Sequence, residues 1–135
     1  MLWLKGLPVR NRVLLAVTLI SALCNIGCSR NSQAEQIARA TTGGSAARGA
    51  TAISRYGCGS CHIIPGVSGA SGLAGPPLSG IGNRIYIAGV LQNTPDNMIR
   101  WIENPPAVDE HTVMPNLGVR HQDAIDIAGY LYTLQ

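Results

Sequence analysis

The stretch Cys58-Gly59-Ser60-Cys61-His62 carries the strongest chemical signal in this sequence. It places one residue pair between two thiols and puts an imidazole directly after the second thiol. This C-x-x-C-H spacing is typical of covalent attachment of a c-type haem, in which the thiols add to the two vinyl groups and the adjacent His reaches the iron. We therefore interpret Cys58 and Cys61 as attachment points and His62 as an iron ligand.

Two other kinds of site use paired cysteines at this spacing. A thioredoxin-like dithiol follows a strand in a βαβ unit, and no convincing strand pattern precedes Cys58. A structural zinc site needs four ligands, and His111 and His121 do not have the spacing of the histidine half of a zinc finger. Haem attachment is therefore the favoured interpretation.

The second axial ligand must come from elsewhere in the chain. Beyond Met1, the thioether candidates are Met98 and Met114, and the imidazole alternatives are His111 and His121. Met98 falls inside a predicted helix, which favours core packing, whereas Met114 lies in an irregular stretch stiffened by Pro115. We predict Met114. A His/Met pair stabilises reduced iron and fills the sixth position, so it indicates an electron-transfer protein and not an enzyme.

The N-terminal part has the layout of a secretory signal. Residues 1–12 are basic and free of acids, Val13–Ile26 is almost wholly apolar, and small residues follow. The end of the run resembles a bacterial lipoprotein signal, in which Cys28 would be acylated. We predict a signal peptide over residues 1–28, of lipoprotein type. Ordinary cleavage, which would leave a freely soluble protein, and an uncleaved anchor are the alternatives. The expected location is the bacterial periplasm, tethered to the membrane.

The net charge of +3 comes from this leader. From Cys28 onward, seven arginines stand against seven acidic residues, so the remainder is about neutral. A neutral chain lacks the basic patch of a nucleic-acid-binding protein, and nucleic acid is excluded as an expected partner.

The rest of the chain divides into a linker and one small domain. Residues 29–45 are rich in Ser, Thr, Ala and Gly, which predicts a flexible linker before a domain over residues 46–135. We expect three helices, from Ala46 after a Ser45 cap, from Pro95 after a Thr94 cap, and from about Gln122 to the end. Residues 63–92 are dense in Gly and Pro, so we expect a loop that wraps a large flat cofactor.

With these residues placed, the chain from about Gly49 to Leu134 resembles a class I cytochrome c of the mitochondrial and bacterial type. Gly75-Pro76-Pro77-Leu78 is similar to the family's Gly-Pro-x-Leu segment, and Trp101-Ile102-Glu103-Asn104-Pro105 to its aromatic-x-Glu-Asn-Pro helix end. The resemblance implies an all-α fold of three to four helices, with long loops around one covalent haem c.

The resemblance also implies roles for individual residues. The carbonyl group of Pro76 would accept the proton on the remote nitrogen of His62 and orient the ring. Arg84 and Thr112 would meet haem propionates. Trp101 would line the pocket near the Met114 sulfur.

Two further features concern the domain's ends and its partner. Gly49 and Ile53 in the first helix, with Tyr130 and Leu131 in the last, resemble the family's helix crossing. No lysine follows Lys5, so the lysine ring by which mitochondrial-type cytochromes dock to acidic partners is missing. Docking is therefore expected to depend less on salt.

The expected function is one-electron transfer to a membrane respiratory complex, such as a haem-copper oxidase. The first alternative is an electron-transfer subunit of a periplasmic dehydrogenase, which an exposed apolar patch would favour. A haem sensor or peroxidase with a labile Met114 ligand, and a thiol-disulfide protein with free thiols at Cys58 and Cys61, are further alternatives.

Overall fold

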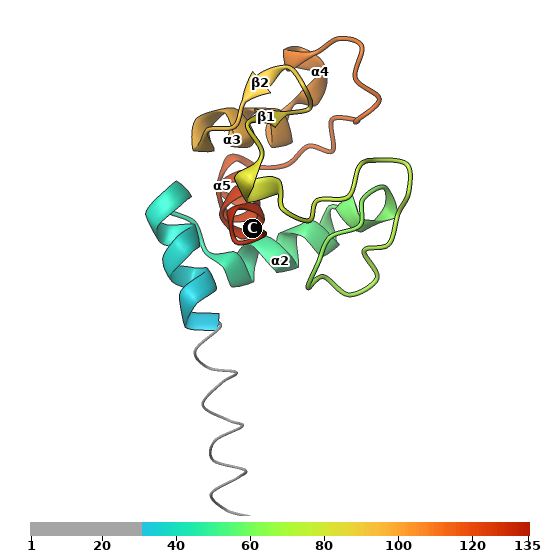
Figure 1. The fold of residues 1–135 in the computed structure, drawn as a ribbon. Helices are drawn as coiled ribbons and strands as arrows, with labels where there is room; N and C mark the ends of the chain where they lie inside the picture. Colours follow the sequence, from blue (N-terminus) through green and yellow to red (C-terminus); the bar gives the residue numbers. More distant parts are fainter. Residues whose placement is uncertain (1–30) are drawn as a thin grey trace, which may run out of the picture. The chain divides into compact units, whose positions relative to one another are not determined.

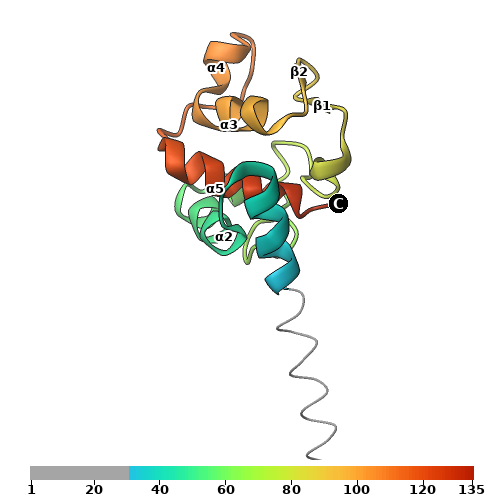
Figure 2. The ribbon, with the colours of Figure 1, turned by 90° about the vertical axis from the view of Figure 1, so that its left-hand side faces the viewer.

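The computed structural model describes residues 31–135, of which residues 34–135 form one compact unit. Helices make up most of its regular structure (Figures 1 and 2), in agreement with the predicted all-α class. The helices of this part of the chain whose ends the structure defines are α2 (Ala46–Arg55), α3 (Pro95–Glu103), α4 (Pro105–Val108) and α5 (His121–Tyr132). Between α2 and α3 lie the 3₁₀ turns η2 (Cys58–Ser60) and η3 (Ile81–Asn83) and a hairpin of β1 (Tyr86–Ile87) and β2 (Leu91–Gln92). The signal peptide predicted over residues 1–28, with Cys28, lies outside the described residues.

The helix starts follow the capping signals of the sequence. The Ser45 hydroxyl accepts a hydrogen bond from the Arg48 amide, and the Thr94 hydroxyl accepts one from the Asn97 amide. Each bond satisfies an amide that the first helical turn leaves without an intrahelical acceptor. The helix α5 begins after Arg120 without a side-chain cap.

The prediction of a flexible linker over residues 29–45 is wrong for most of this segment, because residues 31–42 are helical. Ala38 is fully buried, and a Cβ atom at Gly129 of α5 would lie 3.0 Å from the Ala38 Cβ atom. The Thr42 hydroxyl donates to the Ile125 carbonyl group at 3.1 Å. Small residues, which indicate flexibility in an isolated segment, here allow two helices to pack closely.

The same helix stabilises the start of α2. The Glu35 carboxylate accepts hydrogen bonds from the Ser45 hydroxyl at 3.0 Å and from the Ala47 amide at 2.7 Å. The Ala47 bond is the largest influence lowering the pKa of Glu35 below its ordinary value. The compact unit therefore begins at Ala34 and not at residue 46.

The helices α2 and α5 cross where the sequence predicts, at Gly49. A Cβ atom at this position would lie 2.1 Å from the Asp126 carbonyl oxygen and 2.8 Å from the Tyr130 Cβ atom. Only a residue without a side chain permits this approach. The predicted partners Ile53 and Leu131 are both buried beside the crossing.

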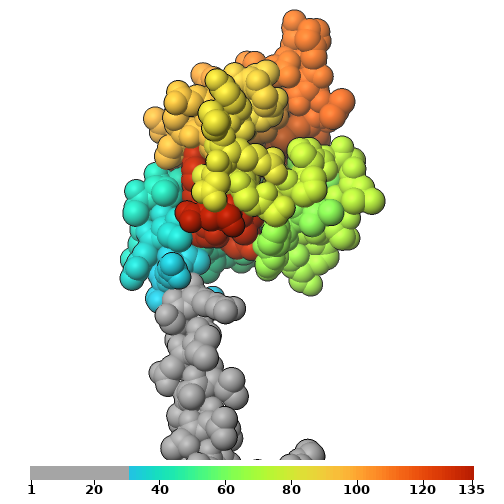
Figure 3. Space-filling view, viewed as in Figure 1, coloured from blue at the N-terminus to red at the C-terminus, as the bar shows by residue number. Residues whose placement is uncertain are grey.

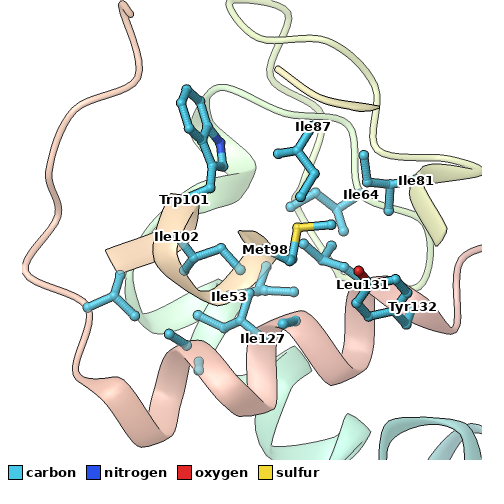
Figure 4. Packing of buried hydrophobic residues seen from close by; sticks show 14 of the residues in the cluster. Ile53, Ile64, Ile81, Ile87, Met98, Trp101, Ile102, Ile127, Leu131 and Tyr132 are labelled. Atoms are coloured by element: carbon cyan, nitrogen blue, oxygen red, sulfur yellow. The ribbon is translucent and has the colours of Figure 1, made fainter. Parts of the chain in front are cut away.

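Figure 4 shows the hydrophobic core, in which α5 packs against both α2 and α3. Met98 of α3 is 2% exposed, and its sulfur points toward Ile64 and Ile87. Trp101 lies on the side of Met98 away from these two isoleucines. Among residues 31–135, no helix has the length and apolar character needed to cross a membrane.

Asp123 joins the C-terminal end of α2 to the first turn of α5. Its carboxylate accepts hydrogen bonds from Arg120 Nε (2.9 Å) and the Tyr56 hydroxyl (2.8 Å), and pairs with Arg55 Nη2 (2.8 Å). These contacts, led by the Arg120 hydrogen bond, lower the pKa of Asp123 to about 2 from an ordinary 3.8.

We therefore expect acid to remove a stabilising contribution from Asp123. Because its pKa is lowered in the folded protein, this contribution is fully present above the ordinary pKa and is lost as the pH falls toward about 2. Thermal unfolding of the wild type and of Asp123→Asn should show a midpoint difference near neutral pH that shrinks between pH 4 and pH 2. Glu110→Gln, on an exposed side chain, is the control, and a difference independent of pH for Asp123→Asn would contradict the prediction.

Candidate functional site

One cavity of about 520 Å³ collects the chemically distinctive side chains of the domain. Its volume lies in the range of about 300–1,000 Å³ that is usual for small-molecule and cofactor sites. Figure 3 shows on one face the loop of residues 61–78 (green), the β1–β2 hairpin (yellow) and the segment after α3 (orange), which supply much of its wall. All the predicted site residues line it: Cys58, Cys61, His62, Pro76, Arg84, Trp101, Thr112 and Met114.

The two thiols reach the cavity because α2 ends in a tight turn. Gly57 has a φ of 71°, a conformation that glycine adopts without strain, and it precedes the 3₁₀ turn Cys58–Ser60. Both cysteines are half-buried free thiols. Burial raises the pKa of the Cys58 thiol. In redox-active C-x-x-C motifs the thiol pKa is usually lowered, so this environment does not favour a reactive dithiol.

His62 is oriented by a backbone carbonyl group. Its Nδ1 atom lies 2.8 Å from the Pro76 carbonyl oxygen. Since a carbonyl oxygen only accepts, we assign the ring proton to Nδ1, and this leaves the Nε2 lone pair free to bind a metal. A Cβ atom at Gly75 would lie 2.3 Å from the ring Cε1 atom, so glycine is required for the backbone to lie against the imidazole.

The loop after the motif folds back on the motif itself. The amides of Gly72 and Gly75 donate to the carbonyl groups of Gly59 (3.0 Å) and Cys61 (2.8 Å). A Cβ atom at Gly72 would lie 2.2 Å from the Ser60 carbonyl oxygen. The glycines that predicted an irregular segment therefore serve close backbone contact with the motif.

Met114 enters the cavity wall from the long segment between α4 and α5. It is half-buried, and its amide donates to the Thr112 hydroxyl oxygen at 3.2 Å. Thr112, expected to contact a propionate, thus also holds the backbone of Met114.

The alternative ligands lie elsewhere or are committed to packing. Met98 lines the cavity too, but it is buried in α3 among core side chains. His111 and His121 are exposed and do not line the cavity. The Nδ1 atom of His121 lies 2.5 Å from a carboxylate oxygen of Glu103. Met114 is thus the thioether that the backbone presents from a loop.

Arg84 and Trp101 occupy different parts of the wall. The indole of Trp101 is largely buried at 8% exposure. The Arg84 Nη2 atom donates to the carbonyl groups of Pro77 (2.5 Å) and Ser79 (3.2 Å). Within residues 31–135, no carboxylate pairs with the Arg84 guanidinium.

Several wall residues were not predicted. Ile64, Ile81 and Ile87 are buried apolar side chains of the cavity wall. They stand in an irregular segment, in the three-residue turn η3 and in the two-residue strand β1, where no helical or alternating pattern marks a buried position. Asn93 does not line the cavity, but its side chain donates to the Ile81 and Arg84 carbonyl groups beside it. It was also missed, because a lone Asn in a loop has no distinguishing sequence signal.

Comparison with known proteins finds similarity to one part of a longer chain. No protein-family model matches this sequence, and no solved structure matches it. The sequence is 33% identical, over 79 residues, to cytochrome c oxidase subunit 2 of Alkalihalophilus pseudofirmus. That match covers 58% of this chain and 22% of the relative, so the chain spans about a fifth of the relative's length.

A metal centre without a cofactor would need a cluster of carboxylate, imidazole or thiol side chains. Within residues 31–135, no three His, Cys, Asp or Glu side chains gather in a group that could hold a metal ion. The cavity is therefore the candidate functional site.

Proposed function

We propose that the protein is a class I c-type cytochrome that carries one electron at a time on a single haem, attached to Cys58 and Cys61, with His62 and Met114 as iron ligands. The observation that carries the proposal is that one apolar cavity has both thiols, an oriented imidazole and a thioether in its wall. The alternative ligands fit less well, because Met98 is packed in the core and His111 and His121 are exposed and do not line the cavity.

The donor set fits a haem. The cavity is large, its wall is mainly aliphatic, and Gly75 lets the backbone lie flat against the His62 ring. When bound, the haem iron supplies reversible one-electron chemistry. The protein contributes attachment, ligands and a dry pocket, and no substrate bond is made or broken.

The surrounding residues would tune this chemistry. The Pro76 carbonyl group keeps the proton on Nδ1 of His62 and makes Nε2 a better donor. Trp101 and the isoleucines exclude water, which strengthens electrostatic interactions inside the cavity. Thr112 fixes the backbone from which Met114 reaches inward.

The partner that we propose is a membrane respiratory complex. The similarity to a subunit named for cytochrome c oxidase supports donation to a haem-copper oxidase. A periplasmic location agrees with this role, because c-type haem is attached outside the cytoplasm. A membrane tether, through a lipid on Cys28 or an N-terminal anchor, would keep the protein beside such a complex.

A second candidate, a permanent electron-transfer subunit of an oxidoreductase, is favoured by an apolar rim at the cavity. Tyr86, Val113 and Leu117 line the cavity and are exposed, Val113 at 94%. Exposed large apolar side chains that continue onto neighbouring segments are Leu73, Ile85 and Val90. Apolar surface of this kind marks contact with another protein. The candidates differ in whether the chain is isolated from its native membrane alone or in a fixed complex.

The absorption spectrum of the exported protein tests the proposed ligands. We expect the haem to remain attached after denaturation, and the oxidised folded protein to show the weak deep-red sulfur-to-iron band. Met114→Leu should abolish this band, because leucine fills similar space but has no sulfur to donate. Met98→Leu is the matched control and should keep it, since Met98 packs in the core. Attached haem with an unchanged band in Met114→Leu would contradict the assignment, and haem without the band in the wild type would favour an open, sensor-like iron.

A further inference from the structure

Asn93 lies at the base of the β1–β2 hairpin, where its side chain uses all of its polar atoms. The Nδ2 atom donates to the carbonyl oxygens of Ile81 (2.9 Å) and Arg84 (2.8 Å). The Oδ1 atom accepts a hydrogen bond from the Tyr132 hydroxyl at 2.8 Å. The backbone amide of Asn93 donates to the Ile85 carbonyl group at 2.8 Å. One side chain therefore joins the turn that carries Arg84 to the last turn of α5.

The residue of α5 that binds Asn93 is itself held in the core. Tyr132 is 9% exposed and belongs to the hydrophobic core. The Gly82 amide donates to the Leu134 carbonyl group at 3.0 Å, which ties the same turn to the chain after α5. Because the carbonyl oxygens of Ile81 and Arg84 can only accept, the Nδ2 group of Asn93 must face them, and Oδ1 is left to accept from the Tyr132 hydroxyl.

Arg84 stands at the other end of the connection, at the edge of the cavity. Its guanidinium group is held by the carbonyl groups of Pro77 and Ser79 and, within residues 31–135, has no carboxylate partner. A guanidinium fixed in this way at the edge of an apolar cavity is suited to a carboxylate ligand.

We propose that Asn93, anchored by Tyr132, is a positioning residue that holds Arg84 at the cavity edge to receive a carboxylate group of the bound cofactor. This inference rests on the proposed function, in which the carboxylate is a haem propionate. The hairpin beyond Arg84 has only two residue pairs, and the side chains of Ile85 and Tyr86 are exposed. Without the Asn93 bonds, the Arg84 backbone would move with this weakly held hairpin.

The test is the reduction potential of the haem-loaded Asn93→Ala protein across a range of pH. A fixed positive charge near the iron favours the reduced state, so loosening Arg84 should lower the ratio of reduced to oxidised protein at a fixed applied potential by about threefold, as for partial loss of one screened charge. The pH at which the potential begins to change should rise, because Arg84 then favours the ionised carboxylate less.

A double-mutant cycle with Arg84→Gln separates positioning from general damage. If Asn93 acts through Arg84, Asn93→Ala should shift the potential in the wild-type background but cause no further shift in Arg84→Gln. Asn97→Ala is the matched control, because it removes a side-chain bond to the Gln92 carbonyl group at 2.9 Å on the same hairpin without touching Arg84. Its potential should stay unchanged.

Tyr132→Phe removes only the hydroxyl that anchors Asn93, and it keeps the proposal testable if Asn93→Ala does not fold. It should shift the potential in the same direction by a smaller factor. Equal shifts in both backgrounds, or no shift in either variant, would overturn the positioning role. A wild type without attached haem would instead contradict the proposed function, so the two failures are distinguishable.

Discussion

The double variant Cys58→Ala/Cys61→Ala is expected to lose all pigment that survives denaturation. Alanine has no thiol to form a thioether bond, and both side chains line the cavity from one short turn. We also expect a less stable fold, because the attached group would bury apolar surface in the cavity of the native state, and its loss leaves that cavity unfilled. Mass determination and the spectrum of the denatured protein measure the first effect, and thermal unfolding measures the second.

Ser60→Ala is the matched control for this experiment. Ser60 lies between the two cysteines, is exposed, and donates its hydroxyl to the Gly57 carbonyl group at 2.7 Å. Its loss should leave pigment attachment intact. Covalent pigment in the double variant would exclude these thiols as attachment points. A colourless wild type with two titratable thiols would instead support the thiol-disulfide alternative.

Gly49→Ala is expected to destabilise the fold by about 3 kcal/mol, at the upper end of the usual cost of overpacking. The added Cβ atom would lie 2.1 Å from the backbone carbonyl oxygen of Asp126. A backbone carbonyl group in the middle of α5 cannot rotate away, so α2 and α5 must move apart. The change would also disturb the hydrogen bonds from Arg48 Nε (2.8 Å) and the Ser45 amide (2.8 Å) to the buried Asp126 carboxylate.

Gly43→Ala is the control with the same chemical change and no collision. Gly43 has a φ of 74°, and a Cβ atom there would meet nothing within 4 Å. Its cost should be about 1 kcal/mol, from the left-handed backbone conformation alone. Denaturant unfolding of both variants measures the difference, and equal destabilisation would contradict the close crossing at Gly49.

The sequence by itself determined the features that depend on neighbouring residues. Ser45 and Thr94 mark helix starts because a side-chain cap and the amide it binds are three residues apart. The C-x-x-C-H motif likewise places its two thiols and imidazole within one short turn, so their common wall was predictable. Gly49 was predicted through the family resemblance, and the helix crossing confirms it.

Only the tertiary structure decided the features that depend on distant residues. The helix of residues 31–42 packs where Thr42 meets Ile125, 83 positions later. Local composition does not distinguish a docked helix of Ala and polar residues from a flexible linker. The role of Asn93 depends on Tyr132, 39 positions away. Such contacts form when the folded chain brings their partners together, and their energy is shared between segments, so neither segment alone carries a sequence signal for them.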